Sequence, residues 1–512
     1  MVLTVHFYQN IDGFFIGVYQ EDLQKLPVHP IVKKYFSAAM HDYVQKKMIS
    51  TKEKTVTVLP TLHVQEIQYF YFVGLGSKKK CTRELLKESF AVAVKASQAY
   101  QARQLVVDMQ SFSKHGATLE ETATDLGEAF ERSAYRFSGY QTTEKSQIKS
   151  PYTIDFYVGT DSLNQATVRT GFRFGRILGN GQNSARTLVN MPSNYLTVDT
   201  FCQYCKDLAK AYDLRIQIYS RTECEEMGMG AFLAVNQGSS IPAQLVVLEY
   251  QGLDEWKNPI AFIGKSVIFD TGGYSLKSSA GMLSMKTDMG GGAAVLGAME
   301  IIGKLKPKAN VLAVLPVTDN VVNSYAYKPD DVITSMSGKT IEITNTDAEG
   351  RLTLCDAITF AKKQGATELI DVATLTGAMM IALGKTVTGM MTNNLAFLAR
   401  FQKAAESATE CVWHMPIFEE HRNSILSSKI ADMVNTQLGN RYGGGLAAGA
   451  FLEQFAGDTP WIHLDIAGPS TTKGTALDPA GGTGVMARSL AYYVLLLSQA
   501  QSSDEKNIVK AQ

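Results

Sequence analysis

The sequence predicts an α/β protein of two domains, a small N-terminal α/β domain and a larger C-terminal domain with a mixed central sheet flanked by helices. Strand-like runs alternate with helical patterns along the chain, as expected of α/β folds. The length of 512 residues exceeds that of one ordinary domain. A composition of 45% hydrophobic and 19% charged residues is typical of a globular chain.

Residues 1–162 contain the elements of the first domain. The strand-like runs are Thr55–Leu59, Gln68–Val73, Gln104–Asp108 and Thr153–Val158. Helical periodicity covers Glu84–Ala102 and Leu119–Tyr135. Because these runs alternate, we expect an α/β domain here. Residues 163–186 are predicted to form a helix that links it to the second domain.

The second domain is predicted to span residues 187–505, and the polar end at 506–512 is expected to fray. Its strand-like runs are Ala243–Tyr250, Ile260–Phe269, Asn310–Pro316, Ile341–Thr344, Leu369–Ala373 and Trp461–Ile466. Helical patterns such as Ala293–Lys304 and Leu354–Gln364 lie between them. We expect chemistry at the strand ends of this sheet, where ligand sites of α/β proteins usually lie.

The most informative stretch of this domain reads Asn-Thr-Asp-Ala-Glu-Gly-Arg-Leu from Asn345. In an extended segment, Asp347, Glu349 and Arg351 would share one face. Two carboxylates so close repel each other unless a cation lies between them or one is protonated. We therefore predict a divalent metal ion here.

Further ionisable residues stand upstream in apolar or glycine-rich surroundings. Lys265 interrupts the run Ile260–Phe269, Asp270 ends it, and Lys277 and Asp288 follow. Buried charges must be paired or bound to metal, so these residues join the candidate site. Lys265 and Asp270 fall on opposite faces of a regular strand. We therefore predict an irregular strand that brings them together.

Three segments resemble the leucyl aminopeptidase family of two-metal exopeptidases: GKSVIFDTGGYSLK, MKTDMGGGAAVLG and NTDAEGRL. The likeness runs from about Thr187 to about Leu497 and implies metal ligands, catalytic side chains and a fold. The implied ligands of two metal ions are Lys265, Asp270, Asp288, Asp347 and Glu349. The implied catalytic side chains are Lys277 and Arg351. For the first domain the likeness is weak and implies a fold similar to macro domains.

The resemblance implies an aminopeptidase that releases leucine-like residues from short peptides with a free N-terminus. A metal pair can activate a water and polarise the substrate carbonyl. The amine of Lys265 must be neutral to bind metal, so burial and the ions would have to lower its pKa. Lys277 is expected to stay charged and stabilise the oxyanion. Arg351 is expected to hold a bicarbonate that accepts a proton from the water.

The family also implies substrate contacts, cofactors and an assembly. The substrate contacts are Met285, Thr374 and Gly377 for the first side chain, the backbone of Leu375, and Asn345 and Ala348 at the next subsite. Zn²⁺ or Mn²⁺ would fit this oxygen-rich site with one amine, as would Mg²⁺ or Co²⁺. We expect a homohexamer whose active sites face an internal cavity.

This sequence departs from the family pattern at four positions that are not ligands: Tyr274, Ser278, Gly292 and Pro469. Tyr274 stands where a small branched apolar residue is usual. It could reorient the loop that carries Lys277, which concerns the rate and not the reaction type. The triple glycine at Gly290 is expected to allow tight helix packing beside the metal site.

Composition bears on partners and compartment. The 49 basic and 49 acidic residues give no net charge, which disfavours nucleic acid and anionic membranes as partners. No run approaches about 18 apolar residues, so no membrane span is expected. The six cysteines show no disulfide framework and the N-terminus lacks signal-peptide features. A reducing, cytoplasmic location is therefore expected.

Three alternatives from other classes stay open at this point. A two-metal phosphatase also clusters carboxylates, although a lysine amine ligand is foreign to it. A DNA-architectural role occurs in some bacterial relatives, and the neutral net charge disfavours it. A non-enzymatic scaffold would keep the fold and bind no ions.

Overall fold

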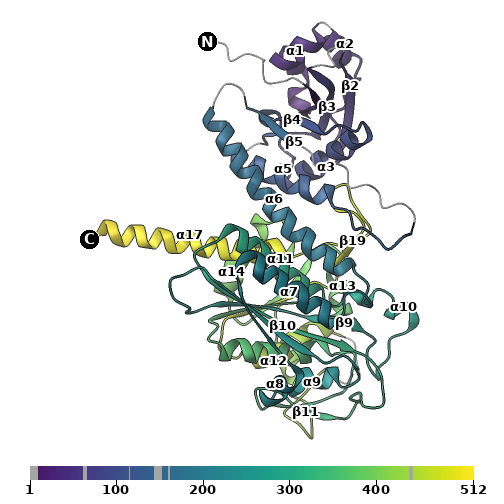
Figure 1. The fold of residues 1–512 in the computed structure, drawn as a ribbon, viewed down its shortest axis with the longest axis vertical. Coiled ribbons are helices and arrows are strands. Elements are labelled where there is room, and N and C mark those ends of the chain that lie inside the picture. Colours follow the sequence, from purple (N-terminus) through teal and green to yellow (C-terminus); the bar gives the residue numbers. More distant parts are fainter. Residues whose placement is uncertain are drawn as a thin grey trace. The chain divides into compact units, whose positions relative to one another are not determined.

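The computed structural model describes residues 10–37, 39–61, 66–114, 116–142, 153–158, 162–437 and 442–511. The chain divides into two compact units. Unit 1 comprises Met1–Asn180 and Lys473–Ala480, and unit 2 comprises Gly181–Thr472 and Gly481–Gln512. Both units contain a sheet and helices (Figure 1), so the predicted two-domain α/β architecture is confirmed.

Unit 1 is built on a five-stranded sheet of order β2-β3-β1-β4-β5. Its strands are β1 (Ile11–Tyr19), β2 (Thr55–Pro60), β3 (Ile67–Gly76), β4 (Gln104–Asp108) and β5 (Thr153–Tyr157). Only β2 runs antiparallel to its neighbour. The central strand β1 was missing from the predicted runs. It is buried on both faces, so its sequence lacks the alternation that marks a half-exposed strand.

Helices cover both faces of this sheet (Figure 1). Phe14, Phe70 and Phe72 pack on one face against η1 (Gln20–Val28), α1 (Pro30–Phe36) and α2 (Ala39–Gln45). Phe15 and Tyr71 point to the other face, towards α3 (Arg83–Ala99), α4 (Met109–Phe112) and α5 (Leu119–Ala134). Successive strand residues thus feed two separate apolar cores.

Unit 2 contains a larger mixed sheet of order β15-β14-β17-β13-β8-β10-β7-β6, with β9 beside β10. Its strands are β6 (Arg215–Tyr219), β7 (Gln244–Gln251), β8 (Ile260–Gly264), β9 (Ser266–Asp270), β10 (Asn310–Asn320), β13 (Glu368–Ala373), β14 (Thr388–Thr392), β15 (Val412–His414) and β17 (Trp461–Asp465). The central strands β17, β13, β8 and β10 are parallel. Small sheets add β11 (Val332–Thr334), β12 (Thr340–Glu342) and β16 (Met433–Val434), and β18 (Thr471–Thr472) with β19 (Gly481–Gly482).

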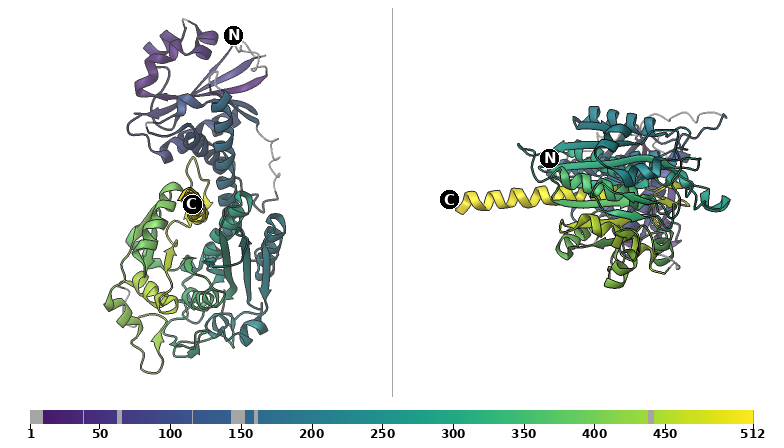
Figure 2. Two further views of the ribbon diagram at one scale, coloured as in Figure 1. Left: turned by 90° about the vertical axis from the view of Figure 1, so that its left-hand side faces the viewer. Right: turned by 90° about the horizontal axis from the view of Figure 1, so that it is seen from below.

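Two layers of helices enclose this sheet (Figures 1 and 2). One layer contains α7 (Val198–Tyr212), α11 (Gly290–Leu305), α14 (Leu395–Ser407) and α17 (Ala487–Ala511). The other contains α8 (Arg221–Glu226), α9 (Gly230–Asn236), α12 (Gly350–Lys363) and α16 (Gly444–Ala456). Shorter elements are α10 (Ser279–Met282), η2 (Met285–Thr287), α13 (Gly377–Leu383) and α15 (Glu419–Ile425). No helix in the described ranges is long and apolar enough to cross a bilayer.

The predicted irregularity between Lys265 and Asp270 is confirmed. The strand breaks at Lys265, whose backbone N–H bonds to the Val372 carbonyl at 3.0 Å. Beyond the break, β9 pairs only with β10, with a register shift between Thr318 and Asn320. The shift releases the two side chains from the strict alternation of a strand.

Three stretches complete the description of the two units: helix α6 (Ser162–Asn190), residues 473–480 and helix α17. Helix α6 occupies the expected connecting segment and passes from unit 1 to unit 2 after Asn180. Residues Lys473–Ala480 leave unit 2 and join unit 1, where Leu477 is buried in the core. The backbone of α17 stays helical to Ala511, over residues that were expected to fray.

Candidate active site

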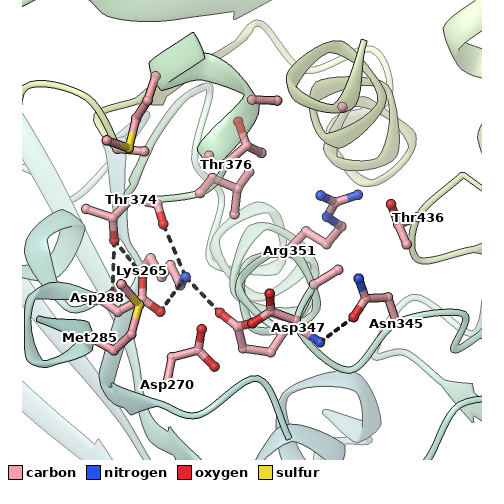
Figure 3. A pocket seen from close by; sticks show the side chains of 18 of the residues that line it. Lys265, Asp270, Met285, Asp288, Asn345, Asp347, Arg351, Thr374, Thr376 and Thr436 are labelled. Atoms are coloured by element: carbon pink, nitrogen blue, oxygen red, sulfur yellow. Dashed lines mark hydrogen bonds and ion pairs between the residues drawn. The ribbon is translucent and has the colours of Figure 1, made fainter. Parts of the chain in front are cut away.

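A single pocket of unit 2, with a volume of about 590 Å³, gathers every predicted site residue. It is lined by Lys265, Asp270, Lys277, Met285, Asp288, Asn345, Asp347, Ala348, Glu349, Arg351, Thr374, Leu375 and Gly377. Figure 3 shows the charged side chains converging from several elements. The pocket opens at the carboxyl ends of parallel strands, which is the usual place for a ligand site in such a sheet.

The segment from Asn345 to Arg351 is not extended, so that prediction was wrong. The side-chain oxygen of Asn345 accepts a hydrogen bond from the backbone N–H of Asp347 at 2.8 Å and makes a turn. Glu349 already has helical backbone angles, and α12 begins at the next residue. The turn still brings the carboxylates together, because Asp270, Asp347 and Glu349 offer oxygens within 4.8 Å of one another.

Two lysines lie among these carboxylates. Lys265 Nζ is 2.6 Å from Asp288 Oδ2 (Figure 3). It is also 2.8 Å from Glu349 Oε1. Lys277 Nζ is 2.7 Å from Asp270 Oδ2 and also pairs with Asp347. Four carboxylates therefore face two ammonium groups.

A glycine gives Lys265 its room. A Cβ at Gly350 would meet Cε and Nζ of Lys265 at 2.6 and 2.8 Å. The glycine in the motif therefore allows the start of α12 to approach the lysine.

Burial and neighbouring charge act in opposite directions on both lysines. Burial lowers the pKa of Lys265, but the carboxylates of Asp288 and Glu349 outweigh it and raise that pKa above its usual value. Burial likewise lowers the pKa of Lys277, and Asp270 and Glu349 raise it. Among protein groups alone, both lysines are thus cations. A neutral Lys265 requires other positive charges beside it.

The carboxylates carry the signs of a cation site. Burial, followed by the charges of Asp270 and Glu349, raises the pKa of Asp347 to about 6. Glu349 Oε2 is buried and has no hydrogen-bond partner within the described part of the chain. An excess of negative charge and an unpartnered carboxylate oxygen fit divalent cations.

Arg351 is a cation of the same pocket and differs from the carboxylates in what it could bind. It is buried, and its Nη1 donates to the Asn435 carbonyl at 2.7 Å. Its Nε has no hydrogen-bond partner among the residues that the structure describes. Burial lowers the pKa of Arg351 to about 10. A buried guanidinium with a spare donor fits a small anion in the pocket.

Asn320, which the sequence did not predict, orients Asp270. Its Nδ2 donates to Asp270 Oδ1 at 2.8 Å and to the Thr346 carbonyl at 3.1 Å. The backbone N–H of Gly272 donates to the same Asp270 oxygen at 2.8 Å. The other oxygen is left to face the pocket. The sequence feature that could have pointed to Asn320 was its position at the end of a strand, β10.

Three of the departures from the family pattern have local explanations. The Tyr274 hydroxyl donates to the Asn323 carbonyl at 3.1 Å, which ties the loop before Lys277 to the loop after β10. Ser278 caps α10 by accepting from Gly281 N–H at 3.2 Å. An alanine in place of Gly292 would collide with Ser266 Oγ. The predicted role of the triple glycine in close helix packing is confirmed, because a Cβ on Gly291 would strike the Val372 carbonyl.

Ten further residues line the pocket and were missing from the prediction. They are Thr287, Thr376, Ala378, Met380, Ile381, Thr436, Gln437, Gly444, Ala467 and Ser470. They are mostly small or apolar, and they come from η2, α13, α16 and the loops after β13, β16 and β17. Such residues carry no local chemical signature, so only the fold could identify them.

Comparison with known proteins identifies the family of this chain. Residues 183–491 match the cytosol aminopeptidase family, catalytic domain, and residues 15–144 match the N-terminal domain of the same family. The chain belongs to the cytosol aminopeptidase family. The resemblance drawn from its three motifs is therefore confirmed, and the protein is a metal-dependent aminopeptidase, a hydrolase that acts on peptides.

Solved structures of a relative support the same fold. The bottromycin maturation enzyme BotP has 28% sequence identity, with a TM-score of 0.82, and the match covers 96% of this chain and 100% of that one. A second structure, of BotP in complex with Mn, has 29% identity and a TM-score of 0.82 and covers 95% and 99%. The second of these structures of a similar protein thus contains manganese.

Proposed function

We propose that this aminopeptidase removes N-terminal residues, preferably leucine-like ones, from short peptides by means of a water activated by two metal ions. The observation that carries the proposal is the imbalance of charge in the pocket, where four carboxylates outnumber three cations, Lys265, Lys277 and Arg351. Lys265 is buried and Lys277 is half-buried among these carboxylates, and divalent cations would neutralise the negative charge that remains.

Five residues would hold the metal ions: Lys265, Asp270, Asp288, Asp347 and Glu349. When bound, two divalent ions would acidify a water, polarise the substrate carbonyl and hold the free amino group of the peptide. Zn²⁺ and Mn²⁺ are the proposed ions, and Mg²⁺ or Co²⁺ would also suit the donor set. With ions present, their charge would lower the pKa of Lys265 and free its amine as a ligand.

The two remaining cations would act on the substrate and on the proton. Lys277 would keep its charge and stabilise the oxyanion that forms when the peptide carbonyl is attacked. Arg351 would hold bicarbonate through its Nε, which has no hydrogen-bond partner among the described residues, and this anion would accept the proton of the water. No carboxylate or histidine of the pocket is assigned this role.

The substrate would lie along the rest of the pocket. Met285, Thr374 and Gly377 would surround the first side chain, and the backbone of Leu375 would contact the substrate. Asn345 and Ala348 would border the second residue. We further propose a cytoplasmic homohexamer whose active sites face an internal cavity, which would admit short peptides and exclude folded proteins.

The test is hydrolysis of leucine amide by the purified protein before chelation, after chelation, and after Zn²⁺ or Mn²⁺ is added back. Loss and recovery of turnover are expected. An aryl phosphate measured in parallel should not be hydrolysed, and a gel shift with duplex DNA at physiological salt should show no retardation. Turnover that survives complete removal of metal would contradict the proposal. Absence of bound metal together with inactivity after manganese addition would favour a scaffold.

A further inference from the structure

Asp465 is a fully buried carboxylate that lies outside the lining of the pocket. It is the last residue of β17 and pairs with Ala373 of β13. Its Oδ2 accepts a hydrogen bond from the Thr376 hydroxyl at 2.7 Å. Its Oδ1 accepts from the backbone N–H groups of Leu375 at 3.3 Å and Ala467 at 3.1 Å.

The groups that Asp465 holds belong to two walls of the pocket. Leu375 and Thr376 lie in the loop after β13, and Ala467 lies in the loop after β17. These strands are parallel neighbours, so their loops leave the sheet side by side. One carboxylate thus ties together residues 374–377 and 467–470, which we call the two wall loops.

The first wall loop also touches the charged cluster. The Thr374 hydroxyl donates to Asp288 Oδ1 at 2.8 Å (Figure 3). The Thr374 carbonyl accepts from Lys265 Nζ at 3.3 Å. A shift of this loop would therefore change the distance between the charged cluster and the part of the pocket that the loop lines.

A buried group of polar side chains lies two residues before Asp465 on β17 and on the neighbouring strand β13. His463 on β17 interacts electrostatically with Asp465. His463 Nδ1 is 2.5 Å from Asp371 Oδ1, and Asp371 Oδ2 accepts from Trp461 Nε1 at 2.6 Å. Burial lowers the pKa of His463, but Asp371 outweighs it and raises that pKa. These hydrogen bonds fix the His463 ring, which acts on Asp465 through its charge alone.

We propose that Asp465 is a positioning residue that sets the separation of the two wall loops and thereby decides how large a first side chain the enzyme accepts. The inference rests on the proposed aminopeptidase function. Asp465 does not touch the substrate and acts through Leu375, Thr376 and Ala467. A misplacement of about 1 Å in a substrate-positioning group costs about 100-fold in rate, so small changes in this carboxylate should be measurable.

The test replaces Asp465 by Asn, which keeps the shape but leaves only one acceptor oxygen. We expect kcat/KM for leucine amide to fall about 10- to 100-fold, mainly through KM, with a loss for alanine amide that is several-fold smaller. Bound metal should stay at the wild-type level. The matched control is Asp356→Asn, another fully buried aspartate that accepts backbone N–H bonds, from Phe232 at 2.9 Å and Met336 at 2.7 Å. This control should leave the leucine-to-alanine ratio unchanged.

A second pair of variants covers the case in which Asp465→Asn does not fold. Thr376→Val removes the hydroxyl that donates to Asp465 Oδ2 and accepts from the Met379 N–H at the start of α13, and Thr376→Ser restores both bonds. Thr376→Val should lower the leucine-to-alanine ratio, and Thr376→Ser should recover most of the loss. Hydrogen exchange should be faster in both wall loops of Asp465→Asn, and in the first wall loop of Thr376→Val, than in the wild type, whether or not substrate is present.

The outcomes separate the inference from the proposed function. A wild-type enzyme that hydrolyses neither amide refutes the proposed function, and the inference fails with it. Hydrolysis by the wild type combined with an unchanged ratio in Asp465→Asn and Thr376→Val overturns the inference alone. Unchanged exchange in the wall loops overturns it as well. Faster exchange together with a reduced ratio supports it.

Discussion

Two buried clusters of charge in this protein differ in how they are neutralised. In unit 1, Lys87 and Arg132 both pair with Glu128, at 3.1 and 2.5 Å. Arg132 also pairs with Asp478 at 2.5 Å, and Arg83 with Asp125 at 2.7 Å. In the pocket of unit 2, four carboxylates face two lysines, and Glu349 Oε2 has no partner in the described residues.

The difference separates a structural cluster from a binding site. In the cluster of unit 1, the acids Asp125, Glu128 and Asp478 are matched by the cations Arg83, Lys87 and Arg132, so the charges balance without a ligand. In the pocket, four carboxylates outnumber the three cations Lys265, Lys277 and Arg351, which is unfavourable unless further cations enter. Burial and charge density alone do not identify a binding site. The site is identified by negative charge that no cation of the chain balances.

The largest expected effect comes from Glu349→Gln in the pocket. We expect loss of metal and of nearly all hydrolysis, about 1,000-fold or more, because a proposed shared ligand is removed. Folding should be retained, since the substitution lowers the excess negative charge. Elemental analysis, leucine amide turnover and circular dichroism measure the three quantities. Normal turnover in this variant would contradict the metal assignment.

The same substitution in unit 1, Glu128→Gln, should have the opposite consequence. Lys87 and Arg132 would each lose a buried negative partner, which should lower the free energy of unfolding by roughly 3–5 kcal/mol. Bound metal and kcat should stay at wild-type levels. Urea denaturation and metal analysis test this. Loss of metal here, with stability intact, would erase the contrast between the clusters.

Lys277→Ala sharpens the comparison inside the pocket. If Lys277 stabilises the oxyanion, kcat should fall about 100-fold or more while both metal ions stay bound. Steady-state kinetics at saturating leucine amide, with metal analysis of the same sample, give the answer. An unchanged kcat would remove Lys277 from the catalytic group.

Asn320→Ala tests whether the support of Asp270 matters for the ions. We expect metal affinity to fall about 10- to 100-fold, because Asp270 Oδ1 loses a hydrogen bond of 2.8 Å. The control is Asn310→Ala at the other end of β10, where the side chain donates to the Glu255 and Lys257 carbonyls. Equilibrium dialysis against buffered Zn²⁺ measures both variants. Equal affinities would show that Asn320 has only a structural role.

The smallest expected effect concerns Asp356, a buried acid held by backbone N–H groups. Burial raises its pKa to about 7, so the folded state holds a proton that the unfolded chain releases near pH 4. Its contribution to stability is therefore present at low pH and is lost as pH rises through about 7. We expect the wild type to lose about 2 kcal/mol more between pH 5 and pH 8 than Asp356→Asn does. Parallel denaturation curves would rule this out if both proteins showed the same pH dependence.

Local sequence determined the charged part of the site and most of the secondary structure. The residues of NTDAEGRL and the two upstream segments pointed to a metal site, because clustered charge among apolar and glycine residues needs a partner wherever the chain folds. Strands such as β4 and helices such as α5 followed from periodicity, which is a property of neighbouring residues. Strand β1, which is buried on both faces, was not predicted because its hydrophobic pattern does not alternate.

Tertiary structure decided which distant residues support these groups, whereas one error of the sequence-based prediction had a local cause. The turn at Asn345 replaced the expected extended segment, because a side chain competed locally for the backbone. Asn320 and Asp465 act on residues that lie 50 and 89 positions away, and Asp478 reaches Arg132 across 346 positions. Contacts at such separations exist only after the sheets have formed, since no local pattern brings their partners together. The kinds of chemical group were thus set by the sequence, and their distances and partners by the fold.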